Sequence, residues 1–525
     1  MGDKAILTEV LEASHLTETY SNLTAKNIIK QLKATNEDGS VKYEGFDREN
    51  GEVEIKTGDD GDKKLPDENS FTVDDAIEFL GFGKFQIKIS LLTGLAWMAD
   101  AMEMMILSIL SPALHCEWGI TSVEQAMITT VVFSGMFLSS TVWGKICDRF
   151  GRKIGLMCSA LLTFSMGVLS AFAPNFKMFL LFRGLTGIGI GGVPQSITLY
   201  AEFLGTAQRA KCVVLIESFW AVGACFESLL AYFIMESLGW RWLLILSSTP
   251  LLIFALSCIW LPESPRFLIS AGRKDDAYHI LQRVANDNNK NLPDGNLIMI
   301  QSHNPETRGH ISNLFTPNLR NTTFLLWFIW MVNAFSYYGI VLLTTVFLQS
   351  SEECHGGGHK TNITDISGCK PLIKDDYVDL LTTTFAEFPG LIITAAIIEW
   401  CGRKKTMAVE FGIYSIFTFF LYFCLSRRSV TAFIFVARAF ISGSFQCAYV
   451  YTPEVYPTSL RAIGLGASSS MARLGAIVTP FVAQVASTHS LYIPITVYGL
   501  FALLGTIASL SLPIETRGRK MADTH

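Results

Sequence analysis

The sequence predicts an all-α membrane protein with twelve transmembrane helices in two six-helix bundles and both termini in the cytoplasm. Half of the 525 residues are hydrophobic, 17% are charged and mean hydropathy is positive, a composition typical of membrane proteins. A helix needs about 20 apolar residues to cross the hydrocarbon core. Such runs begin near Ile89, Gln125, Lys153, Met178, Cys212 and Trp240, and again near Thr323, Tyr377, Thr406, Val430, Ala462 and Leu491.

The same charged pattern occurs in both halves of the chain, about 251 residues apart. The matched residues are Arg152 and Arg403, Glu202 and Glu454, Arg209 and Arg461, and Arg266 and Arg517. This spacing is far longer than the unit of a solenoid repeat. It indicates two copies of one bundle, related by an axis along the membrane normal, with a substrate path between them.

Basic residues in the short loops predict the orientation of the helices. One side of the membrane collects basic residues such as Lys145, Arg149 and Lys404, whereas the other side has few. The basic side is therefore cytoplasmic. We expect a disordered cytoplasmic tail over 1–80, an N-terminal bundle over 84–261, a cytoplasmic connector over 262–320, a C-terminal bundle over 321–512 and a cytoplasmic tail over 513–525. Within the tail, short helices are expected at 6–16 and 73–80, and an amphipathic helix is expected in the connector at 274–285.

The longest exterior loop is expected at residues 349–376. It contains Cys354, Cys369 and a glycosylation sequon at Asn362. In an oxidising compartment two such cysteines form a disulfide by default. Free thiols are one alternative, and a metal site with the neighbouring histidines is another, although the spacing fits no standard zinc pattern. We expect a Cys354–Cys369 disulfide, a glycan on Asn362 and no metal.

Four glycines between residues 187 and 192 match the fingerprint of a dinucleotide-binding loop. That function requires a preceding strand and the start of a helix. These glycines instead lie inside an apolar span, where small residues let neighbouring helices approach closely. The sequence therefore predicts close helix packing here.

Several motifs carry a resemblance to a known family over residues 75 to 520. The segment from Gly144 to Lys153 resembles the cytoplasmic signature of the major facilitator superfamily, and Glu399–Lys405 resembles its second copy. Arg183 and the segment Pro262–Arg266 resemble the sugar-porter and organic-ion branch. The position of the long exterior loop, together with the segment Leu95–Ser108, resembles the synaptic vesicle two-related group.

The resemblance implies that cytoplasmic charges form networks that hold the two bundles in one state. The implied gate residues are Asp148, Arg152, Glu202, Arg209, Glu454 and Arg461. The second copy departs from the pattern, because Glu399 replaces the aspartate and Trp400 replaces an arginine. The alternative interpretation of the lysines beside these motifs is that they only anchor the helices at the membrane surface.

Ionisable residues inside the spans are costly and mark candidate functional positions. Counting about 1.5 Å per residue places Asp100 roughly 15 Å and Arg183 roughly 9 Å from the exterior end of their spans. The resemblance implies that an Asp of the first span meets an Arg of the fourth, either as a proton-coupling pair or as a structural pair. The candidate substrate- or proton-binding residues are Asp100, Glu103, Arg183, Glu227, Tyr337, Tyr338, Glu387 and Arg473.

The charge of the predicted substrate depends on Arg473. This residue is expected about 16 Å into the eleventh span, among small residues that leave room for a ligand. The resemblance implies an anionic substrate, since related organic anion transporters carry Arg at this position. Acidic residues in the same cavity, Asp100 and Glu103 among them, leave a cation as the alternative.

These observations predict a secondary transporter that moves a small organic ion by alternating access, with protons as a candidate coupling ion. We expect no cofactor, no metal, no nucleic-acid partner and no enzymatic activity, since no nucleophile–base constellation or phosphate-binding loop occurs in the sequence. The expected location is a multi-pass position in a synaptic-vesicle-like or plasma membrane. The alternative function is a transport-inactive protein of the same fold that acts in vesicle binding or trafficking.

The sequon gives a direct test of the predicted orientation. Protein expressed in a cell with a secretory pathway should lose apparent mass on glycosidase treatment, because Asn362 lies on the side poor in basic residues. The variant Asn362→Gln should abolish the shift. A wild-type protein that shows no shift would contradict both the glycan and the assigned topology.

Overall fold

The computed structural model describes residues 70–205, 212, 216–298, 310–349, 371–423, 426–457 and 460–517. Several predictions lie outside the described residues: those on residues 1–69 of the expected tail, the gate residue Arg209, the sequon at Asn362, and the pair Cys354 and Cys369.

Six spans make up the first half of the molecule. They are α4 (Lys84–Trp118), α5 (Ser122–Phe150), α6 (Arg152–Ala171), α7 (Phe176–Ile190) followed by α8 (Gln195–Ala201), α10 (Ser218–Ile234) and α11 (Trp240–Ser257). The second half contains α14 (Arg320–Gln349), α15 (Lys374–Phe385) followed by α16 (Glu387–Cys401), α17 (Arg403–Phe420), α18 (Arg427–Val455), α19 (Arg461–Pro480) and α21 (Tyr492–Ser511). A π-helix, η3 (Phe481–Ala486), and the short α20 (Ser487–His489) extend α19.

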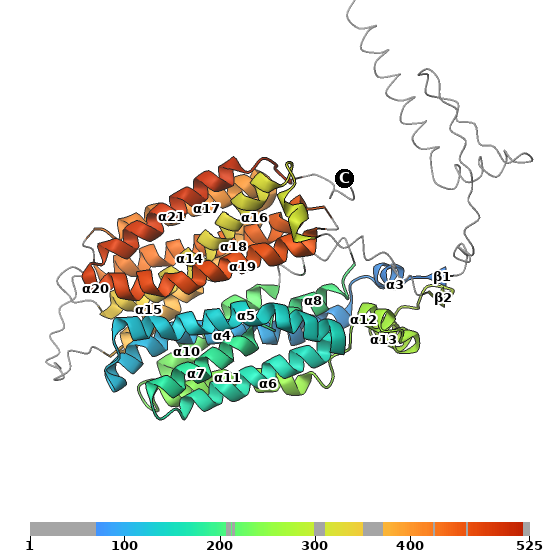
Figure 1. The fold of residues 1–525 in the computed structure, drawn as a ribbon, viewed down its shortest axis with the longest axis horizontal. Helices are drawn as coiled ribbons and strands as arrows, with labels where there is room; N and C mark the ends of the chain where they lie inside the picture. The colour runs from blue at the N-terminus through green and yellow to red at the C-terminus, as the bar shows by residue number, and fades with distance from the viewer. Residues whose placement is uncertain are drawn as a thin grey trace, which may run out of the picture. The chain divides into compact units, whose positions relative to one another are not determined.

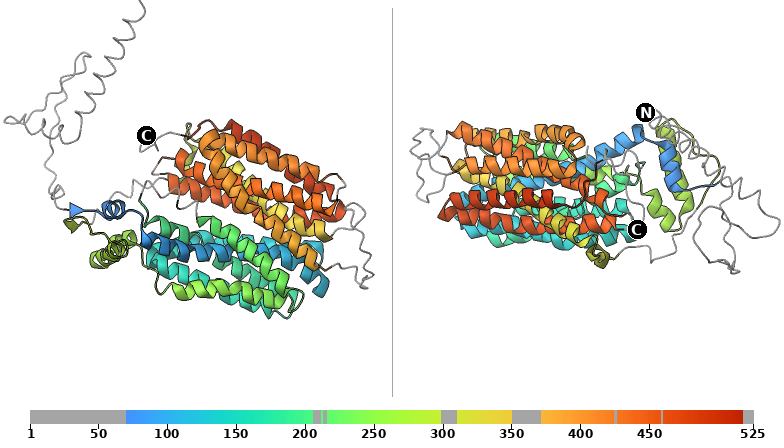
Figure 2. Two further views of the ribbon diagram at one scale, coloured as in Figure 1. Left: turned by 180° about the vertical axis from the view of Figure 1, so that it is seen from behind. Right: turned by 90° about the horizontal axis from the view of Figure 1, so that it is seen from above.

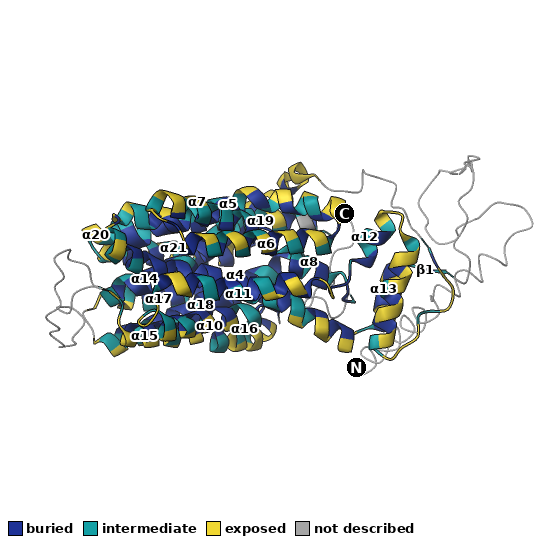
Figure 3. Cartoon of the chain, turned by 90° about the horizontal axis from the view of Figure 1, so that it is seen from below, coloured by how far each residue is buried: buried dark blue, intermediate teal, exposed yellow. Residues whose placement is uncertain are grey.

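The number of spans agrees with the prediction. Among the described residues, nine helices are long and apolar enough to cross a membrane. The other three spans are α10, which is shorter, α17, which begins with three basic residues, and α19, which is rich in Ser and Gly. Large apolar side chains such as Leu138, Phe233 and Ile392 are exposed on the outer helix surfaces (Figure 3). Such surfaces suit contact with lipid.

The two halves repeat one packing arrangement. In the first half α4 packs on α10, α5 on α7 and α6 on α11; in the second half α14 packs on α19, α16 on α18 and α17 on α21. Helices of the first half, blue to green, lie together, and so do those of the second half, yellow to red (Figures 1 and 2). The bundles meet where α5 contacts α19 and where α10 contacts α15. The duplication predicted from the charged pattern is therefore also present in the way the helices pack.

A small cytoplasmic unit lies beside the first bundle. It contains β1 (Ser70–Phe71), α3 (Val73–Leu80), α12 (Pro265–Ser270), α13 (Lys274–Asp287) and β2 (Asn296–Leu297), with η2 (Ile311–Phe315) further along the connector. The strands β1 and β2 pair in parallel. Phe71 and Ile77 pack with Leu268 and Leu281 in one apolar core.

Two predictions about this unit can be assessed. The helices expected at 73–80 and 274–285 are both present. The tail predicted to extend to residue 80 differs, since residues 70–80 fold against the connector. Thr72 and Asp75 form a capping box that begins α3, and the connector covers its apolar face. The polar composition of the tail indicates neither this capping box nor the apolar contacts with the connector.

Two glycines allow the tight turns that precede α6 and α17. Gly151 has φ +102° and Gly402 has φ +85°, a region that side chains disfavour. A Cβ at Gly151 would lie 2.2 Å from Glu263 Oε2, and a Cβ at Gly402 would lie 2.7 Å from Glu515. The glycines inside α7 also show close packing, because a Cβ at Gly187 would lie 2.2 Å from the Val132 carbonyl oxygen. This contact confirms the packing interpretation of the glycine motif.

The variant Gly151→Ala should lower the thermal melting midpoint of the purified protein. The substitution combines a strained backbone, which costs about 1–3 kcal/mol, with a clash against Glu263. Gly144→Ala is the matched control, because it lies seven residues earlier in α5 with nothing closer than Gln195 Nε2 at 3.9 Å. Equal melting midpoints for the two variants would show that the turn does not require glycine.

Candidate functional site

The first bundle contains a fully buried ion pair between Glu103 of α4 and Arg183 of α7. Arg183 Nη2 lies 2.8 Å from Glu103 Oε2, and neither side chain is exposed. A second carboxylate, Glu227 of α10, accepts a hydrogen bond of 2.8 Å from Ser247 and interacts electrostatically with both members of the pair. One arginine is therefore shared electrostatically by two buried carboxylates.

The partner of Arg183 differs from the prediction. Asp100 was expected to meet Arg183, but Glu103 occupies that position. Glu103 lies three residues nearer the exterior end of α4, which is about 4.5 Å along the helix. This displacement brings Glu103 to the depth of Arg183 and leaves Asp100 on the cytoplasmic side of the pair.

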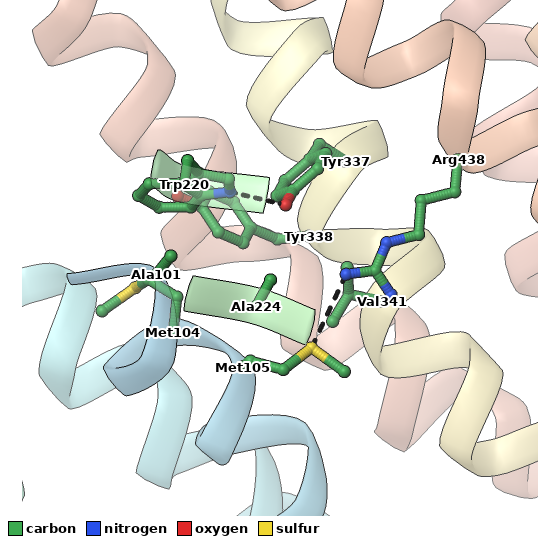
Figure 4. Close-up of a pocket in the computed structure, with 9 residues that line it drawn as sticks. All are labelled: Ala101, Met104, Met105, Trp220, Ala224, Tyr337, Tyr338, Val341 and Arg438. Atoms are coloured by element: carbon green, nitrogen blue, oxygen red, sulfur yellow. Dashed lines mark hydrogen bonds between the residues drawn. The ribbon is translucent and has the colours of Figure 1, made fainter. Parts of the chain in front are cut away.

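The second bundle contains a buried pair of its own, between Glu387 of α16 and Arg438 of α18. Their closest atoms are 3.0 Å apart. Tyr337 donates a hydrogen bond of 2.8 Å to Glu387, and Trp220 of the first bundle donates one of 2.8 Å to Tyr337. Arg438 also contacts the Met105 sulfur at 3.6 Å, so the pair is joined to both α10 and α4 across the interface (Figure 4).

A small cavity lies at this junction of the bundles. Its lining includes Met104, Trp220, Tyr337, Tyr338 and Arg438 (Figure 4). Its volume is about 10 Å³, which is room for about one water molecule. A substrate larger than water therefore needs the bundles to move apart before it can enter.

Asp100 of α4 and Arg473 of α19 belong to different bundles. Arg473 of α19 donates a hydrogen bond of 3.0 Å to Ser469, one turn earlier in the same helix. Glu217 accepts hydrogen bonds from Trp97 at 3.0 Å and from Gln446 of the second bundle at 3.1 Å.

Aromatic rings line the same part of the interface. The ring centroids of Trp97 and Trp220 are 5.6 Å apart, and those of Tyr337 and Tyr338 are 5.2 Å apart. Tyr338 also packs on Phe133 at 4.6 Å. The predicted binding residues Tyr337 and Tyr338 both line the small cavity.

Charged residues pair with one another at the cytoplasmic end of the first bundle. Arg152 lies 3.0 Å from Asp148 and 3.4 Å from Glu202. Glu263 of the connector accepts hydrogen bonds from the backbone N–H groups of Arg152 and Lys153, in the first turn of α6. Burial raises the pKa of Glu263, an effect opposed by these N–H donors.

The second bundle builds the same network despite its divergent sequence. Arg403 lies 3.2 Å from Glu399 and 3.0 Å from Glu454. Glu515 accepts hydrogen bonds from the backbone N–H groups of Arg403 and Lys404, as Glu263 does in the first bundle. These contacts lie within each bundle, whereas the resemblance implied contacts between bundles. Arg461 lies at the start of α19.

Sequence reasoning missed several of these residues. Arg403 was noted only as part of the repeat, and Glu263 and Glu515 were not singled out. The repeat itself carried the signal, since Glu263 directly follows one Leu-Pro pair and Glu515 follows the other with one residue between. Glu410 was also missed. It is fully buried in α17 and forms a hydrogen bond of 2.5 Å with Thr394. Cys116, at the exterior end of α4, is disulfide-bonded.

Contacts between the bundles are frequent toward the exterior. Lys374 forms an ion pair with Glu236 at 2.9 Å, and Gln484 donates a hydrogen bond of 3.0 Å to Ser111. Thr130 donates one of 3.1 Å to the carbonyl oxygen of Ile477. This conformation is therefore closed toward the exterior.

Comparisons with known proteins agree with this architecture. Residues 36–352 match the family described as Sugar (and other) transporter. The chain is 64% identical to the Caenorhabditis elegans protein svop-1, over 100% of each chain. It is 54% identical to the synaptic vesicle 2-related protein of Rattus norvegicus, over 87% of this chain and 84% of that relative. The identity to organic cation/carnitine transporter 7 of Arabidopsis thaliana is 36%, over 86% of this chain and 96% of that relative.

The fold is also similar to solved structures. A partially occluded, inward-open structure of the xylose transporter XylE from E. coli has a TM-score of 0.65 at 17% sequence identity, covering 83% of this chain and 99% of that one. At this identity the likeness concerns the fold alone.

The variant Glu387→Gln should destabilise the protein strongly. It leaves Arg438 without its anion, and breaking a buried pair in this way costs about 3–5 kcal/mol. Adding Arg438→Met should restore most of the melting midpoint, because no unpaired charge then remains. Glu399→Gln, at an exposed acid of the same bundle, is the control and should change little. A double variant as unstable as the single one would contradict this account.

Proposed function

The chain belongs to the sugar transporter family of the major facilitator superfamily, and we propose that it is a secondary active transporter that moves a small organic ion by alternating access. The path runs between the two bundles, through the cavity beside Tyr337 and Arg438. Names of the relatives support this class of solute, since one is an organic cation/carnitine transporter.

The observation that carries the proposal is the pair of buried arginine–carboxylate contacts, one in each bundle. Charges this deep are costly in a membrane helix. A helix that served only as an anchor would be more stable with apolar residues at these positions. The Glu387–Arg438 pair also joins the two bundles through Tyr337 and Trp220, so movement of the bundles must change its surroundings.

We propose that protons drive the transport through Glu103, Arg183 and Glu227. One guanidinium balances one carboxylate, and a proton balances the other. Loss of that proton to one side of the membrane would leave two anions competing for Arg183 and favour a different packing of α4, α7 and α10. A solved relative in fold is described as a proton:xylose symporter, which supports a proton as the coupling ion.

The location we propose is the membrane of an intracellular vesicle or the plasma membrane. Support comes from the synaptic vesicle 2-related proteins, which match 87% of the chain.

Uptake by purified protein in liposomes tests the function. A pH gradient should drive the accumulation of at least one member of a panel of small organic anions, cations and zwitterions. Binding of a panel member without any uptake would favour the transport-inactive alternative.

The variant Glu103→Gln should lose proton-driven accumulation. The substitution removes the carboxylate that pairs with Arg183 but keeps a similar shape, and Glu227 remains as a second carboxylate for Arg183, so exchange of internal for external substrate should continue. Asp275→Asn, an exposed acid of α13, is the control and should accumulate substrate like the wild type. Full proton-driven accumulation by Glu103→Gln would refute the coupling role.

A further inference from the structure

Glu410 of α17 is a buried acid of the second bundle that the proposed mechanism does not use. The residue is fully buried. In the part of the chain that the structure describes, no Lys, Arg or His forms an ion pair with it within 4.0 Å. A carboxylate without a cation is costly inside a membrane bundle. The neutral, protonated form of the acid avoids that cost.

The hydrogen bonds around Glu410 also agree with the protonated form. Thr394 Oγ1 of α16 lies 2.5 Å from Glu410 Oε1 and 2.9 Å from the backbone carbonyl oxygen of Gly390. A hydroxyl has one hydrogen, so Thr394 donates to only one of these oxygens at a time. An ionised Glu410 would leave the other oxygen without a hydrogen. A protonated Glu410 donates its O–H to Thr394, whose own hydrogen then bonds Gly390.

The second carboxyl oxygen of Glu410 has no donor. Glu410 Oε2 is buried without a hydrogen-bond partner. An ionised carboxylate shares its charge between both oxygens, so both of them need donors. As the carbonyl oxygen of a neutral acid, Oε2 carries less charge, and its burial without a partner is less costly.

Three helices close tightly around this carboxyl group. A Cβ added at Gly443 of α18 would lie 2.1 Å from Thr394 Oγ1 and 2.7 Å from Glu410 Oε1. Even one methyl group would therefore displace the contact. A proton fits between these oxygens, whereas a metal ion with six or more oxygen ligands does not.

The nearby cations are engaged by other acids. Arg438 of α18 pairs with Glu387 of α16 at 3.0 Å. Arg403, two turns before Glu410 in α17, pairs with Glu454 at 3.0 Å. Neither arginine is available to balance an ionised Glu410 in this conformation.

Other titratable groups on the packed helices are neutral. Cys447 faces Glu410 from α18, and its thiol donates a hydrogen bond of 3.2 Å to the carbonyl oxygen of Arg403. Tyr498 of α21 and Tyr414 of α17 donate hydrogen bonds to backbone carbonyl oxygens. These groups supply no charge to Glu410.

We propose that Glu410 is a proton-binding site of the second bundle, occupied in this conformation and separate from the proton assigned to the first bundle. The bound proton joins α17 to α16 through Thr394. Two turns earlier on the same face of α16, Glu387 holds Arg438, which reaches the other bundle. Loss of the proton would place an unbalanced charge among α16, α17 and α18, and would repack them beside this contact between the bundles.

Infrared difference spectra of the full-length protein in liposomes detect the proton directly. Exchange of H2O for D2O lowers the C=O stretching frequency of a protonated carboxyl group, and a carboxylate has no such band. At neutral pH the wild type should show a component of this band that Glu410→Gln lacks. Thr394→Val, which removes the acceptor of the O–H, should shift that component without abolishing it. Glu399→Gln, at an exposed acid of the same bundle, is the control and should keep it unchanged.

The pH dependence of stability is a second measurement. Above about pH 5 the unfolded chain has released the proton that the folded protein keeps, so rising pH favours unfolding of the wild type. Relative to Glu410→Gln, the folding equilibrium constant should fall about tenfold per pH unit until the site itself loses its proton. Glu410→Gln resembles the neutral acid, and its melting midpoint should therefore rise relative to that of the wild type as the pH increases.

The outcomes decide the proposal without a substrate. A band that is unchanged in both Glu410→Gln and Thr394→Val overturns the proton site. A Glu410→Gln variant that melts below the wild type by the same amount at every pH overturns it too, since an ionised acid behaves in this way. If Glu410→Gln does not fold, an unshifted band in Thr394→Val is sufficient to overturn it. Failure of the site leaves the transport function standing, and absence of uptake leaves the site standing.

Discussion

Every charge buried between the helices of this protein needs a partner, because neither lipid nor a closely packed bundle solvates it. Arg183 meets Glu103 and Arg438 meets Glu387, each at 3.0 Å or less. These pairs determine which helices must lie together: α4 with α7 in one bundle, and α16 with α18 in the other. The arrangement of the spans follows from the residues that carry these charges.

The duplication gives the two bundles equivalent parts with different surroundings. At the cytoplasmic ends Arg152 and Arg403 have matching carboxylate partners, and Glu263 and Glu515 contact the starts of α6 and α17 alike. At mid-depth the symmetry is broken. Arg183 is enclosed in its own bundle, whereas Arg438 reaches Met105 of the other bundle. Because of this asymmetry, movement of the bundles changes the surroundings of the second pair more than those of the first.

Much of the fold could be predicted from the sequence, because span length and the repeat depend on local composition. The choice of Glu103 over Asp100 as the partner of Arg183 could not, since a depth count does not resolve three residues on one helical face. The second cytoplasmic network was hidden by Glu399 and Trp400, although a glutamate one methylene longer still reaches Arg403. The ordered segment 70–80 depended on a connector about 190 residues away. Contacts between distant segments decided each of these differences.

In the proposed mechanism, the two bundles alternate between states that are closed at opposite ends. Distances between spin labels test it without knowledge of the substrate. One pair, at Val123 and Thr488, spans the exterior end, and another, at Lys145 and Lys405, spans the cytoplasmic end; all four positions are exposed. When the pH is varied in lipid nanodiscs, we expect the exterior distances to lengthen as the cytoplasmic ones shorten. One fixed distribution of distances for both pairs at every pH would show that the bundles do not alternate.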